Sequence, residues 1–550
     1  MSFLFDNTSD IVHIHVANLA ILAQERGIPY IFSLHDHHVV RHGKDSQTYK
    51  ENLDAIKGSI ISFTHAENLC KYFDETDKLF YLSHGVDTEL YKNDSLIKPY
   101  TKLLCVANNG YADNQSVDRK GFRYAIEAAR ELNYPITIVG TKNKTKRVPN
   151  SYVKVKSQET KPDILFFIAD DMTSIDCEPY GNKDVHTPNL AKLAKEGMVF
   201  DNMNNATAMC GPTRQSLYTG IFPVKNGSYP NHAQVYDNII SIVQHFKKIG
   251  YRVGLIGKQH YAPAASFPFE YLGGRNSDNG EGIDVELGDA EKWINKDRSK
   301  PYLLIVASNQ PHGPWNRGNT KQYDFSKLTI APYMVDTEMT RKELVKYYAE
   351  ITYMDSLVGT CTKIVEKQKN VDNTLFLFAS EHGSSMPFAK WTCYNMGLKA
   401  AFIAKWPKVI KPNTRTDILA QYIDVVPTLF EAAGGKPETL RGNKEQTLPL
   451  DGKSFYTTIS GKSKGVRDYV YGVHTTRGIK NGSDNYPVRS IQDHYYKLIW
   501  NLKFNEPFLS SGSQPKNKLY NSWLNSKNTT PKQAEHAKLY RNRPEFELYN

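Results

Sequence analysis

Cysteine is scarce in this chain, with six residues in 550, and none of them forms a CxxC pair or the spacing of a disulfide framework. This scarcity argues against a zinc ribbon and against a small disulfide-stapled domain. No apolar run approaches the ~20 residues of a membrane-spanning helix. The first sixteen residues lack the basic start and continuous apolar core of a signal peptide. We therefore expect a soluble globular protein without an export signal, and the sequence leaves its compartment open.

Basic residues outnumber acidic ones, 69 to 58, and give a net charge of +11, but the lysines are scattered rather than gathered in blocks. A sulfated glycan, a nucleic acid or plain solvent would all suit such a surface, so the charge selects a partner only weakly. Because no basic block or apolar span is present, we predict no nucleic-acid partner and no membrane partner. Hydrophobic residues make up 40% of the chain, which is ample for sizeable cores.

Two sections of different character meet at a polar, lysine-rich stretch over residues 140–163. In the first section, short apolar runs predict strands near 10–16, 28–36, 59–65, 78–85, 102–108 and 135–140. Helical patterns over 18–27 and 121–133 lie among them. Strands that alternate with helices predict right-handed crossovers and a parallel sheet.

Three apolar runs of the second section end in polar residues that carry chemistry. "DILFFIADD" ends in Asp170 and Asp171, "YLLIVASNQPHGPW" leads to His312, and "TLFLFASEHG" leads to Glu381 and His382. Such runs suit parallel strands that are buried on both faces. Ligands of open α/β sheets bind beyond the carboxyl ends of the strands, so these residues should meet at one sheet edge.

Three carboxylates at one edge would repel each other unless a cation lay between them. Calcium or magnesium suits this oxygen-rich set better than zinc does. Further along the chain, "GLIGKQHY" adds Lys258 and His260, and "PFAKWT" adds Lys390. Each residue alone could be a helix cap, a core histidine or a loop lysine, but together they predict a site for a tetrahedral anion such as phosphate or sulfate.

A single cysteine, Cys210, opens the stretch "AMCGPTRQSLYTG" at 208–220. Isolated cysteines most often behave as small buried apolar side chains. The proline two residues later predicts a helix that begins beside Cys210, where backbone N–H groups favour an anion. The frame Cys-x-Pro-x-Arg, followed by leucine and Thr-Gly, closely resembles the signal by which members of the sulfatase family have their cysteine oxidised to formylglycine.

This resemblance implies a mechanism in which the aldehyde hydrate of residue 210 attacks sulfur and then expels sulfate as the aldehyde re-forms. It implies calcium bound by Asp170, Asp171, Cys210 in its modified form, Glu381 and His382. Arg214, Lys258 and Lys390 would bind the hydrate and sulfate oxygens. His260 would be the base that helps the hydrate collapse, and His312 the acid that protonates the leaving atom. The family usually has aspartate where this chain has Glu381.

The resemblance covers most of residues 162–550 and implies an α/β, alkaline-phosphatase-like sandwich with a mostly parallel central sheet. We expect a catalytic domain over 158–450 and a small C-terminal α+β subdomain over 451–550. "PYGNKDVHTPNLAKLAKEGMVFDN", "PLDGKSF" and the tail "RPEFELYN" resemble the sulfamidases, which cleave the N-sulfate of glucosamine. In "GVHTTRG", His474 and Arg477 are candidates for substrate contact, with surface-loop residues as the alternative.

The first section, residues 1–157, resembles part of a GT-B glycosyltransferase of the family-4 type through "YLSHGVDTELY" and "DRKGFRYAIEAA". Arg119 and Lys120 match residues that help to hold the donor diphosphate. The acceptor domain is incomplete and the later Glu-x7-Glu motif is missing. We therefore expect a remnant, a glycan-binding or packing module, or a wrong gene join rather than an active transferase.

The sequence thus favours a calcium-dependent sulfatase that acts on a sulfated glycan and depends on a formylglycine-generating enzyme. An O-sulfatase of another sugar is one alternative. A non-catalytic glycan-binding protein is a second, because Cys210 stays a thiol where the modifying enzyme is absent. A phosphatase or phosphodiesterase of the same superfold ranks last, since the cysteine frame and sparse histidines argue against a two-zinc site. Relatives of this kind work in lysosomes, in the periplasm or outside cells, which conflicts with the missing export signal.

Overall fold

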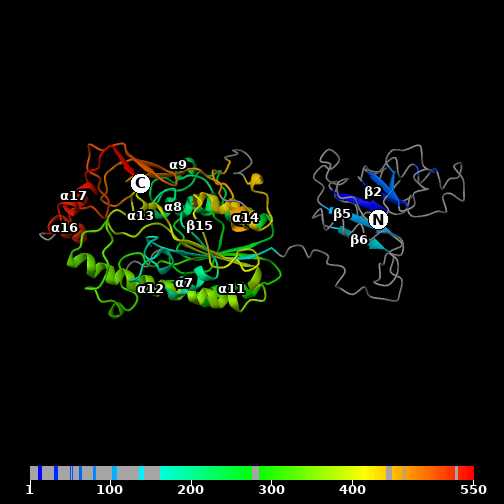
Figure 1. Cartoon of the computed structure of the whole chain (residues 1–550), viewed down its shortest axis with the longest axis horizontal. Helices are drawn as coiled ribbons and strands as arrows, with labels where there is room; N and C mark the ends of the chain where they lie inside the picture. The colour runs from blue at the N-terminus through cyan, green and yellow to red at the C-terminus, as the bar shows by residue number, and fades with distance from the viewer. Residues whose placement is uncertain are drawn as a thin grey trace. The chain divides into compact units, whose positions relative to one another are not determined.

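The computed structural model divides the chain into two compact units, residues 1–160 and 161–550, each described here by itself (Figure 1). In the second unit it describes residues 161–275, 284–440, 449–462, 465–526 and 530–550. In the first unit it describes residues 10–14, 30–34, 50, 53, 61–64, 79–81, 102–107 and 136–140. Arg119, Lys120 and the two helices expected over 18–27 and 121–133 lie outside the described residues.

The first unit contains a six-stranded sheet in the order β4-β3-β2-β1-β5-β6, and every neighbouring pair is parallel. Its strands are β1 (Asp10–Ile14), β2 (Tyr30–Leu34), β3 (Ile61–Thr64), β4 (Leu79–Tyr81), β5 (Lys102–Ala107) and β6 (Ile136–Gly140). Each strand falls within one of the apolar runs that predicted it. The parallel sheet expected for the first section is therefore confirmed.

A mixed eight-stranded sheet forms the centre of the second unit, in the order β11-β10-β12-β7-β13-β14-β8-β15. Its strands are β7 (Asp163–Ala169), β8 (Met198–Phe200), β10 (Arg252–Gly257), β11 (Glu270–Tyr271), β12 (Tyr302–Ala307), β13 (Thr374–Ser380), β14 (Phe402–Lys405) and β15 (Thr414–Thr416). Only the pairs β13–β14 and β14–β8 are antiparallel. The sheet is mostly parallel, as predicted.

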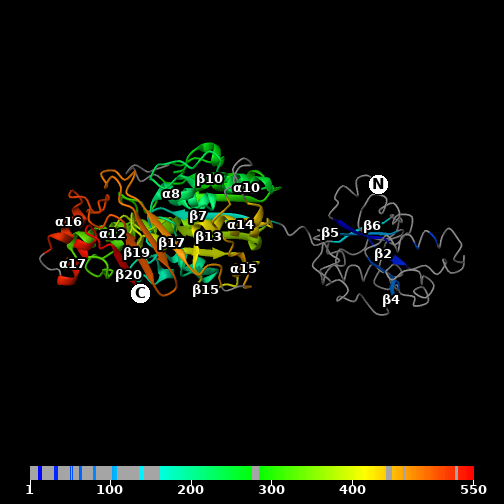
Figure 2. The same cartoon turned by 90° about the horizontal axis from the view of Figure 1, so that it is seen from above.

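Successive residues of β7 explain why the sheet is covered on both faces. Leu165 and Phe167 pack in one buried cluster, and Phe166 and Ile168 pack in another on the opposite face. The first cluster includes residues of α7 (Pro188–Lys195), α11 (Leu287–Lys296) and α12 (Glu338–Glu366). The second includes residues of α8 (Cys210–Thr219), α10 (Ile242–Lys248) and α14 (Val425–Ala432). Figures 1 and 2 show the resulting helix–sheet–helix sandwich.

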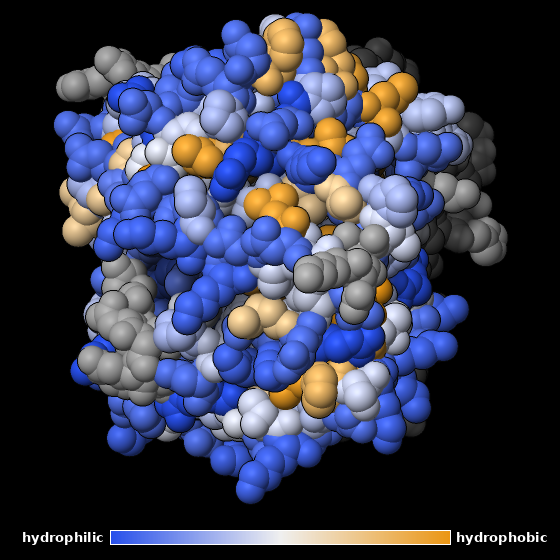
Figure 3. Space-filling view, turned by 90° about the vertical axis from the view of Figure 1, so that its left-hand side faces the viewer, coloured by the Kyte–Doolittle hydropathy of each residue, from blue (hydrophilic) through white to orange (hydrophobic). Residues whose placement is uncertain are grey.

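A four-stranded antiparallel sheet, β17-β18-β19-β20, follows near the C-terminus. Its strands are β17 (Val470–His474), β18 (Val488–Gln492), β19 (Lys497–Asn501) and β20 (Phe546–Tyr549), and α16 (Lys518–Leu524) and α17 (Pro531–Leu539) lie between β19 and β20 in the chain. Trp523 of α16 is buried and its indole N–H donates to Thr340 of α12 over 2.8 Å. The end of the unit that carries α16 and α17 shows apolar residues in small groups among hydrophilic ones (Figure 3).

Shorter elements connect these layers. They are the strand pair β9 (Met203–Asn204) and β16 (Ala420–Gln421), the helices α9 (Pro223–Asn226), α13 (Asn395–Leu398) and α15 (Tyr456–Ile459), and the 3₁₀ helices η2 (Glu178–Tyr180), η3 (Ala264–Ser266), η4 (Thr320–Gln322), η5 (Val371–Asn373), η6 (Tyr422–Asp424) and η7 (Pro437–Thr439). Among the described residues, no helix combines the length and apolar character that crossing a membrane requires.

Candidate active site

Four adjacent parallel strands, β10, β12, β7 and β13, end at the same edge of the central sheet. The polar residues predicted to meet there follow these strands in the chain: Lys258 after β10, His312 after β12, Asp170 and Asp171 after β7, and Glu381 and His382 after β13. The structure brings them together, as the rule for ligand sites in open α/β sheets predicts. Lys390 reaches the same place from the loop that follows β13.

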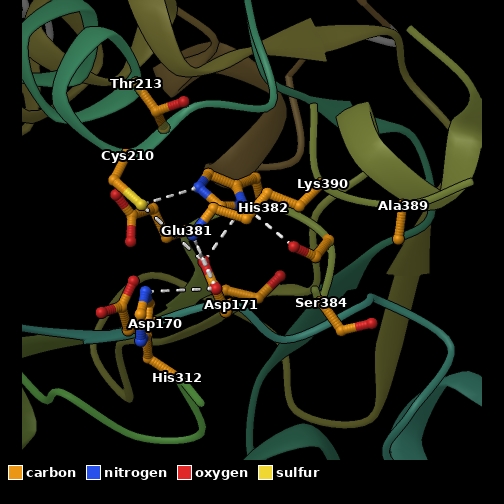
Figure 4. Close-up of polar contacts among 12 residues, drawn as sticks. Asp170, Asp171, Cys210, Thr213, His312, Glu381, His382, Ser384, Ala389 and Lys390 are labelled. Atoms are coloured by element: carbon orange, nitrogen blue, oxygen red, sulfur yellow. Dashed lines mark hydrogen bonds and ion pairs between the residues drawn. The ribbon is translucent and has the colours of Figure 1, made fainter. Parts of the chain in front are cut away.

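Cys210 is the first residue of α8, a helix in which every residue is buried. No side chain caps the start of this helix, so its first backbone N–H groups favour a negative charge beside Cys210. The Cys210 thiol lies 3.3 Å from Nε2 of His382 and 3.8 Å from Oδ1 of Asp171. Figure 4 shows the sulfur directed at both groups. The cysteine singled out in the sequence therefore lies among the predicted metal ligands.

The Cys210 thiol and the His382 imidazole favour each other's charged form. Burial acts to raise the pKa of Cys210, but the positive charges of Lys258, Lys390 and His382 outweigh it and hold the pKa well below its ordinary value. Burial acts to lower the pKa of His382, yet Cys210, together with Asp171, raises it to about 9. Before any modification, these shifts favour a thiolate beside an imidazolium.

Arg214 lies one helical turn after Cys210 and pairs with Glu381. Its Nε donates to Oε1 over 2.9 Å and its Nη2 donates to Oε2 over 2.8 Å. Both side chains are at most 1% exposed. Burial acts to raise the pKa of Glu381, but the charge of Arg214 lowers it to about 2. This bidentate pair is geometrically specific and fully desolvated.

The two lysines of the site pair with the two aspartates that follow β7. Lys258 Nζ lies 2.5 Å from Oδ2 of Asp170, and Lys390 Nζ lies 2.8 and 2.7 Å from the two carboxylate oxygens of Asp171. None of the four side chains is more than 6% exposed. Burial opposes the charge of each lysine, but the aspartate beside it raises the lysine pKa.

Three buried carboxylates thus face three buried cations of the chain itself. We expected a cation between the carboxylates, and in the structure Arg214, Lys258 and Lys390 each contact one of them. The assignment of these three residues to the hydrate and sulfate oxygens stays a prediction.

A cluster of possible metal ligands lies within this network. One ligand atom from each of Asp171, Cys210, Glu381 and His382 lies within 4.8 Å of the others, and all four residues are buried. Asp170 Oδ1 is also buried and makes no hydrogen bond within the described part of the chain. Calcium accepts several carboxylate oxygens in a flexible shell, so these donors fit a calcium ion.

His260 approaches the start of α8 from the β10 side. A Cβ atom placed on Gly211 would lie 3.3 Å from His260 Nε2, so the imidazole lies directly over the helix N-terminus. The same Nε2 lies 3.1 Å from Nδ1 of His232, and His232 Nε2 lies 3.0 Å from the Asn231 amide nitrogen. In this amide orientation, His232 Nε2 accepts a hydrogen bond and Nδ1–H donates to His260.

His232 and Asn231 were not predicted from the sequence. They follow no apolar run and belong to no motif, so strand patterning could not reveal them. The only sequence signal is an adjacent amide and imidazole about twenty residues after Cys210.

Among the predicted catalytic histidines and lysines that form an ion pair, His312 has the most exposed side chain. Its side chain is 36% exposed, compared with 6% for Lys258. His312 Nδ1 lies 2.7 Å from the Gly313 carbonyl oxygen, so Nδ1–H donates and Nε2 faces Asp171 Oδ2 at 3.5 Å (Figure 4). Nε2 therefore faces a buried carboxylate, although the imidazole as a whole is partly exposed.

A cleft of about 510 Å³ borders these histidines, and we call it the His232 cleft. Its lining residues are Asn231, His232, Trp391, Gly478, Ile479, Lys480 and Ser511. His232 contacts His260, and the Trp391 ring centroid lies 4.9 Å from Lys390 Nζ. The cleft therefore opens beside the residues that surround Cys210.

The two candidates for substrate contact in the C-terminal part differ in exposure. His474 ends β17 and is only 2% exposed, so the surface-loop alternative does not hold for it. Arg477 is exposed. Both line a second cavity of about 300 Å³.

Comparison with known proteins places the site in context. Residues 162–435 match the family model described as Sulfatase. An ulvan-active sulfatase of Formosa agariphila is 37% identical over 347 residues, which cover 62% of this chain and 66% of that protein. N-sulphoglucosamine sulphohydrolase of Homo sapiens is 24% identical over 379 residues, which cover 62% and 74%. A second ulvan-active sulfatase of Formosa agariphila, 24% identical, is covered over 64% of its length.

Solved structures share the fold at low identity. Phosphonate monoester hydrolase of Agrobacterium radiobacter aligns with a TM-score of 0.51 and 16% identity, over 62% of this chain and 87% of that one. A 2-O GAG sulfatase aligns with a TM-score of 0.50 and 18% identity, over 63% and 84%. These likenesses agree with the predicted alkaline-phosphatase-like architecture. The family match begins at residue 162, so the glycosyltransferase-like first section stays a prediction.

Proposed function

Because residues 162–435 belong to the sulfatase family, we propose that this chain hydrolyses sulfate from a sulfated glycan. One observation carries the proposal. Cys210 stands in a Cys-x-Pro-x-Arg frame, begins a wholly buried helix, and directs its sulfur at His382 and Asp171. A merely structural cysteine needs no such charged surroundings.

We infer that Cys210 is converted to formylglycine, whose hydrate supplies the nucleophile of the reaction. The folded structure supports a condition on this step. Cys210 is only 3% exposed and every residue of α8 is buried, so another enzyme cannot reach the cysteine once the helix has packed. The formylglycine-generating enzyme must therefore act before the second unit has folded.

A calcium ion is the metal that the donor set fits best, and it would polarise a sulfate oxygen. Asp170, Asp171, Glu381 and His382 would hold it, together with the modified residue 210. Asp170 Oδ1 supports this assignment, because it is buried without a hydrogen bond and Arg214 Nη2 lies 3.7 Å away from it. A divalent charge added to balanced pairs of carboxylates and cations would attract the negative sulfate group.

Two histidines are placed to move protons. His260 lies over the start of α8, and we assign it as the base that takes a proton from the side chain of residue 210. Its Nε2 accepts the His232 Nδ1–H bond in this structure, so it takes that proton only once this bond is exchanged for one to residue 210. His312 is partly exposed and directs Nε2 at Asp171, which would hold the proton that His312 gives to the leaving atom of the substrate. His232 holds His260 in place through the bond between Nδ1 and Nε2.

For the substrate, two candidates rest on different observations. The sequence motifs resemble the sulfamidases, which supports the N-sulfate of glucosamine. The relative with 37% identity is an ulvan-active sulfatase, which supports a sulfate ester of an ulvan-type polysaccharide. The fold cannot separate them, since a phosphonate monoester hydrolase shares it.

The test joins mass spectrometry to sulfate release. The full chain is expressed with and without a formylglycine-generating enzyme, and the peptide that contains residue 210 is weighed. Sulfate release is then measured on N-sulfoglucosamine, glucosamine 6-sulfate and ulvan oligosaccharides, with Cys210→Ala as the control.

We expect an aldehyde at residue 210 and release from one substrate class by converted protein alone. Converted protein that releases no sulfate from any of them would refute the proposed activity. If native material carries an intact thiol, the non-catalytic glycan-binding alternative is favoured instead.

A further inference from the structure

A second cavity, of about 300 Å³, lies between the segment after α9 and the first hairpin of the C-terminal sheet. Its polar lining comes from Tyr229, His474, Thr475, Arg477, Asn485 and Arg489, and we call it the two-arginine cavity. Its volume is at the lower end of the range for small-ligand sites, roughly 300–1,000 Å³. No step of the proposed reaction uses it.

The two arginines of this cavity have no acidic partner. Arg477 Nη1 lies 3.3 Å from the Tyr229 hydroxyl, and Arg489 Nη1 donates to the carbonyl oxygens of Val488 and His474 over 2.9 and 3.5 Å. Within the described part of the chain, neither guanidinium has a carboxylate within ion-pair distance. Two guanidinium forks without acids make the cavity a positive site that suits a carboxylate or a sulfate group.

His474 belongs to the lining of this cavity, but its ring lies in the interior against Phe508 rather than in the open space. Its side chain is 2% exposed, and neither ring nitrogen has a hydrogen-bond partner in the described residues. Burial, with Arg543 and Arg489, lowers its pKa to about 3, so the ring is neutral and offers one N–H donor. The case for an anion in this cavity therefore rests on the two arginines, with the Tyr229 hydroxyl beside Arg477.

The cavity is joined to the catalytic site by one short connection. The backbone N–H of Asn231 donates to the Arg477 carbonyl oxygen over 3.1 Å, and the Asn231 side chain holds His232 beside His260. Gly478 has φ 83°, and a Cβ there would lie 2.3 Å from the Asn231 carbonyl oxygen, so this close approach requires glycine. Arg477 lines the two-arginine cavity, while Gly478 lines the His232 cleft, so the two spaces are neighbours.

We propose that the two-arginine cavity binds a second anionic group, a carboxylate or a sulfate, of the same glycan whose sulfate is cleaved at Cys210. This inference rests on the proposed function and deepens it. The substrate is then an acidic oligosaccharide of at least two sugars, and a sulfated monosaccharide fills only part of the site.

The first experiment compares substrates of different length. The test variant combines Arg477→Gln with Arg489→Gln, and the control variant combines Lys292→Gln with Lys327→Gln. The control removes the same charge from two lysines whose side chains are each 82% exposed. Converted enzyme is assayed on N-sulfoglucosamine and glucosamine 6-sulfate, and on a heparin tetrasaccharide and an ulvan oligosaccharide. We expect kcat/KM on the cleaved oligosaccharide to fall at least tenfold through KM in the arginine variant only, with monosaccharide rates unchanged. Equal losses on both lengths, or no loss, would overturn the proposal.

The second experiment does not depend on turnover. Binding of the same oligosaccharides to the full-length Cys210→Ala chain is measured by calorimetry, with and without the arginine substitutions. A tenfold weaker Kd in the arginine variant supports the cavity even if no sulfate is ever released, whereas an unchanged Kd refutes it. The single variants Arg477→Gln and Arg489→Gln each remove one of the two charges. Each should weaken binding in the same direction and serves if the double variant fails to fold.

Discussion

The buried pair between Arg214 and Glu381 is the strongest test of how this site is built. Replacing Glu381 by glutamine keeps the size of the side chain but removes its charge. The Arg214 guanidinium, 0% exposed, then loses the two charged hydrogen bonds that hold it. Its Nη2 then keeps Asp170 Oδ1 at 3.7 Å, and its Nη1 still donates to the Lys258 carbonyl oxygen over 3.4 Å.

The size of the expected loss of stability follows from the burial of both Arg214 and Glu381. Breaking a buried ion pair by removing one partner costs about 3–5 kcal/mol, because the other charge stays in the interior. The pKa of Glu381, lowered from 4.5 to about 2, independently corresponds to about 3 kcal/mol. Because the folded-state pKa is lowered, this stability is fully present above pH 4.5 and is lost as the pH falls toward 2.

Tryptophan fluorescence is well suited to the measurement. All six tryptophans lie between residues 293 and 523, so urea unfolding followed by fluorescence reports on the second unit alone. The titration is run at pH 7 in EDTA, which removes any effect through a bound metal. We expect Glu381→Gln to lower the free energy of unfolding by about 3 kcal/mol or more.

A double-mutant cycle separates the pair from other effects. Arg214→Met and the double variant complete the cycle, and the double variant should lose less stability than the two single losses combined. If Glu381→Gln changes the free energy of unfolding by less than about 1 kcal/mol, or if the two losses simply add, the pair does not hold the site together.

Three further predictions use other parts of the same unit. Calcium at 100 times its Kd should raise the free energy of unfolding by about 2.7 kcal/mol. Asp171→Asn should abolish this stabilisation by calcium, and a stabilisation that survives the substitution would place the metal elsewhere. Burial raises the pKa of Asp176 to about 7, so the folded state resists ionisation of this carboxyl and loses stability as the pH rises from about 4 to 7. In urea titrations at pH 5 and pH 8, Asp176→Asn should remove most of that loss of stability. His232→Ala should lower kcat about tenfold or more with little change in KM, and should alter the pH profile of kcat; a normal profile with unchanged kcat would show that His260 needs no support.

The architecture was largely predictable because apolar runs are a strong signal for buried parallel strands. "DILFFIADD" and "TLFLFASEHG" correspond to β7 and β13 together with the residues that follow them, and the six runs of the first section contain β1 to β6. The convergence of Asp171 and Glu381 followed from the same rule, since neighbouring parallel strands end at one edge.

Side-chain partners were not predictable in this way. That Arg214 faces Glu381 rather than solvent depends on how α8 packs against the sheet, which no local pattern encodes. His474 was expected to be either a substrate contact or part of a surface loop, but its place at the end of β17 buries it. His232 became visible only through its contact with His260. Such contacts join residues distant in sequence, where patterning carries no information.

The charge of the site bears on how it could select sulfate. In the unmodified chain, three carboxylates match one arginine and two lysines, and the thiolate of Cys210 matches the imidazolium of His382. The buried groups therefore nearly cancel, and the arginine and lysines have little positive charge left for an anion. A bound calcium ion, and the loss of the thiolate when Cys210 is converted, would each leave the site more positive. Calcium binding and the conversion of Cys210 would thus prepare the nucleophile and also create the attraction for sulfate. An unconverted, metal-free chain should therefore be a poor sulfate binder at this edge of the sheet.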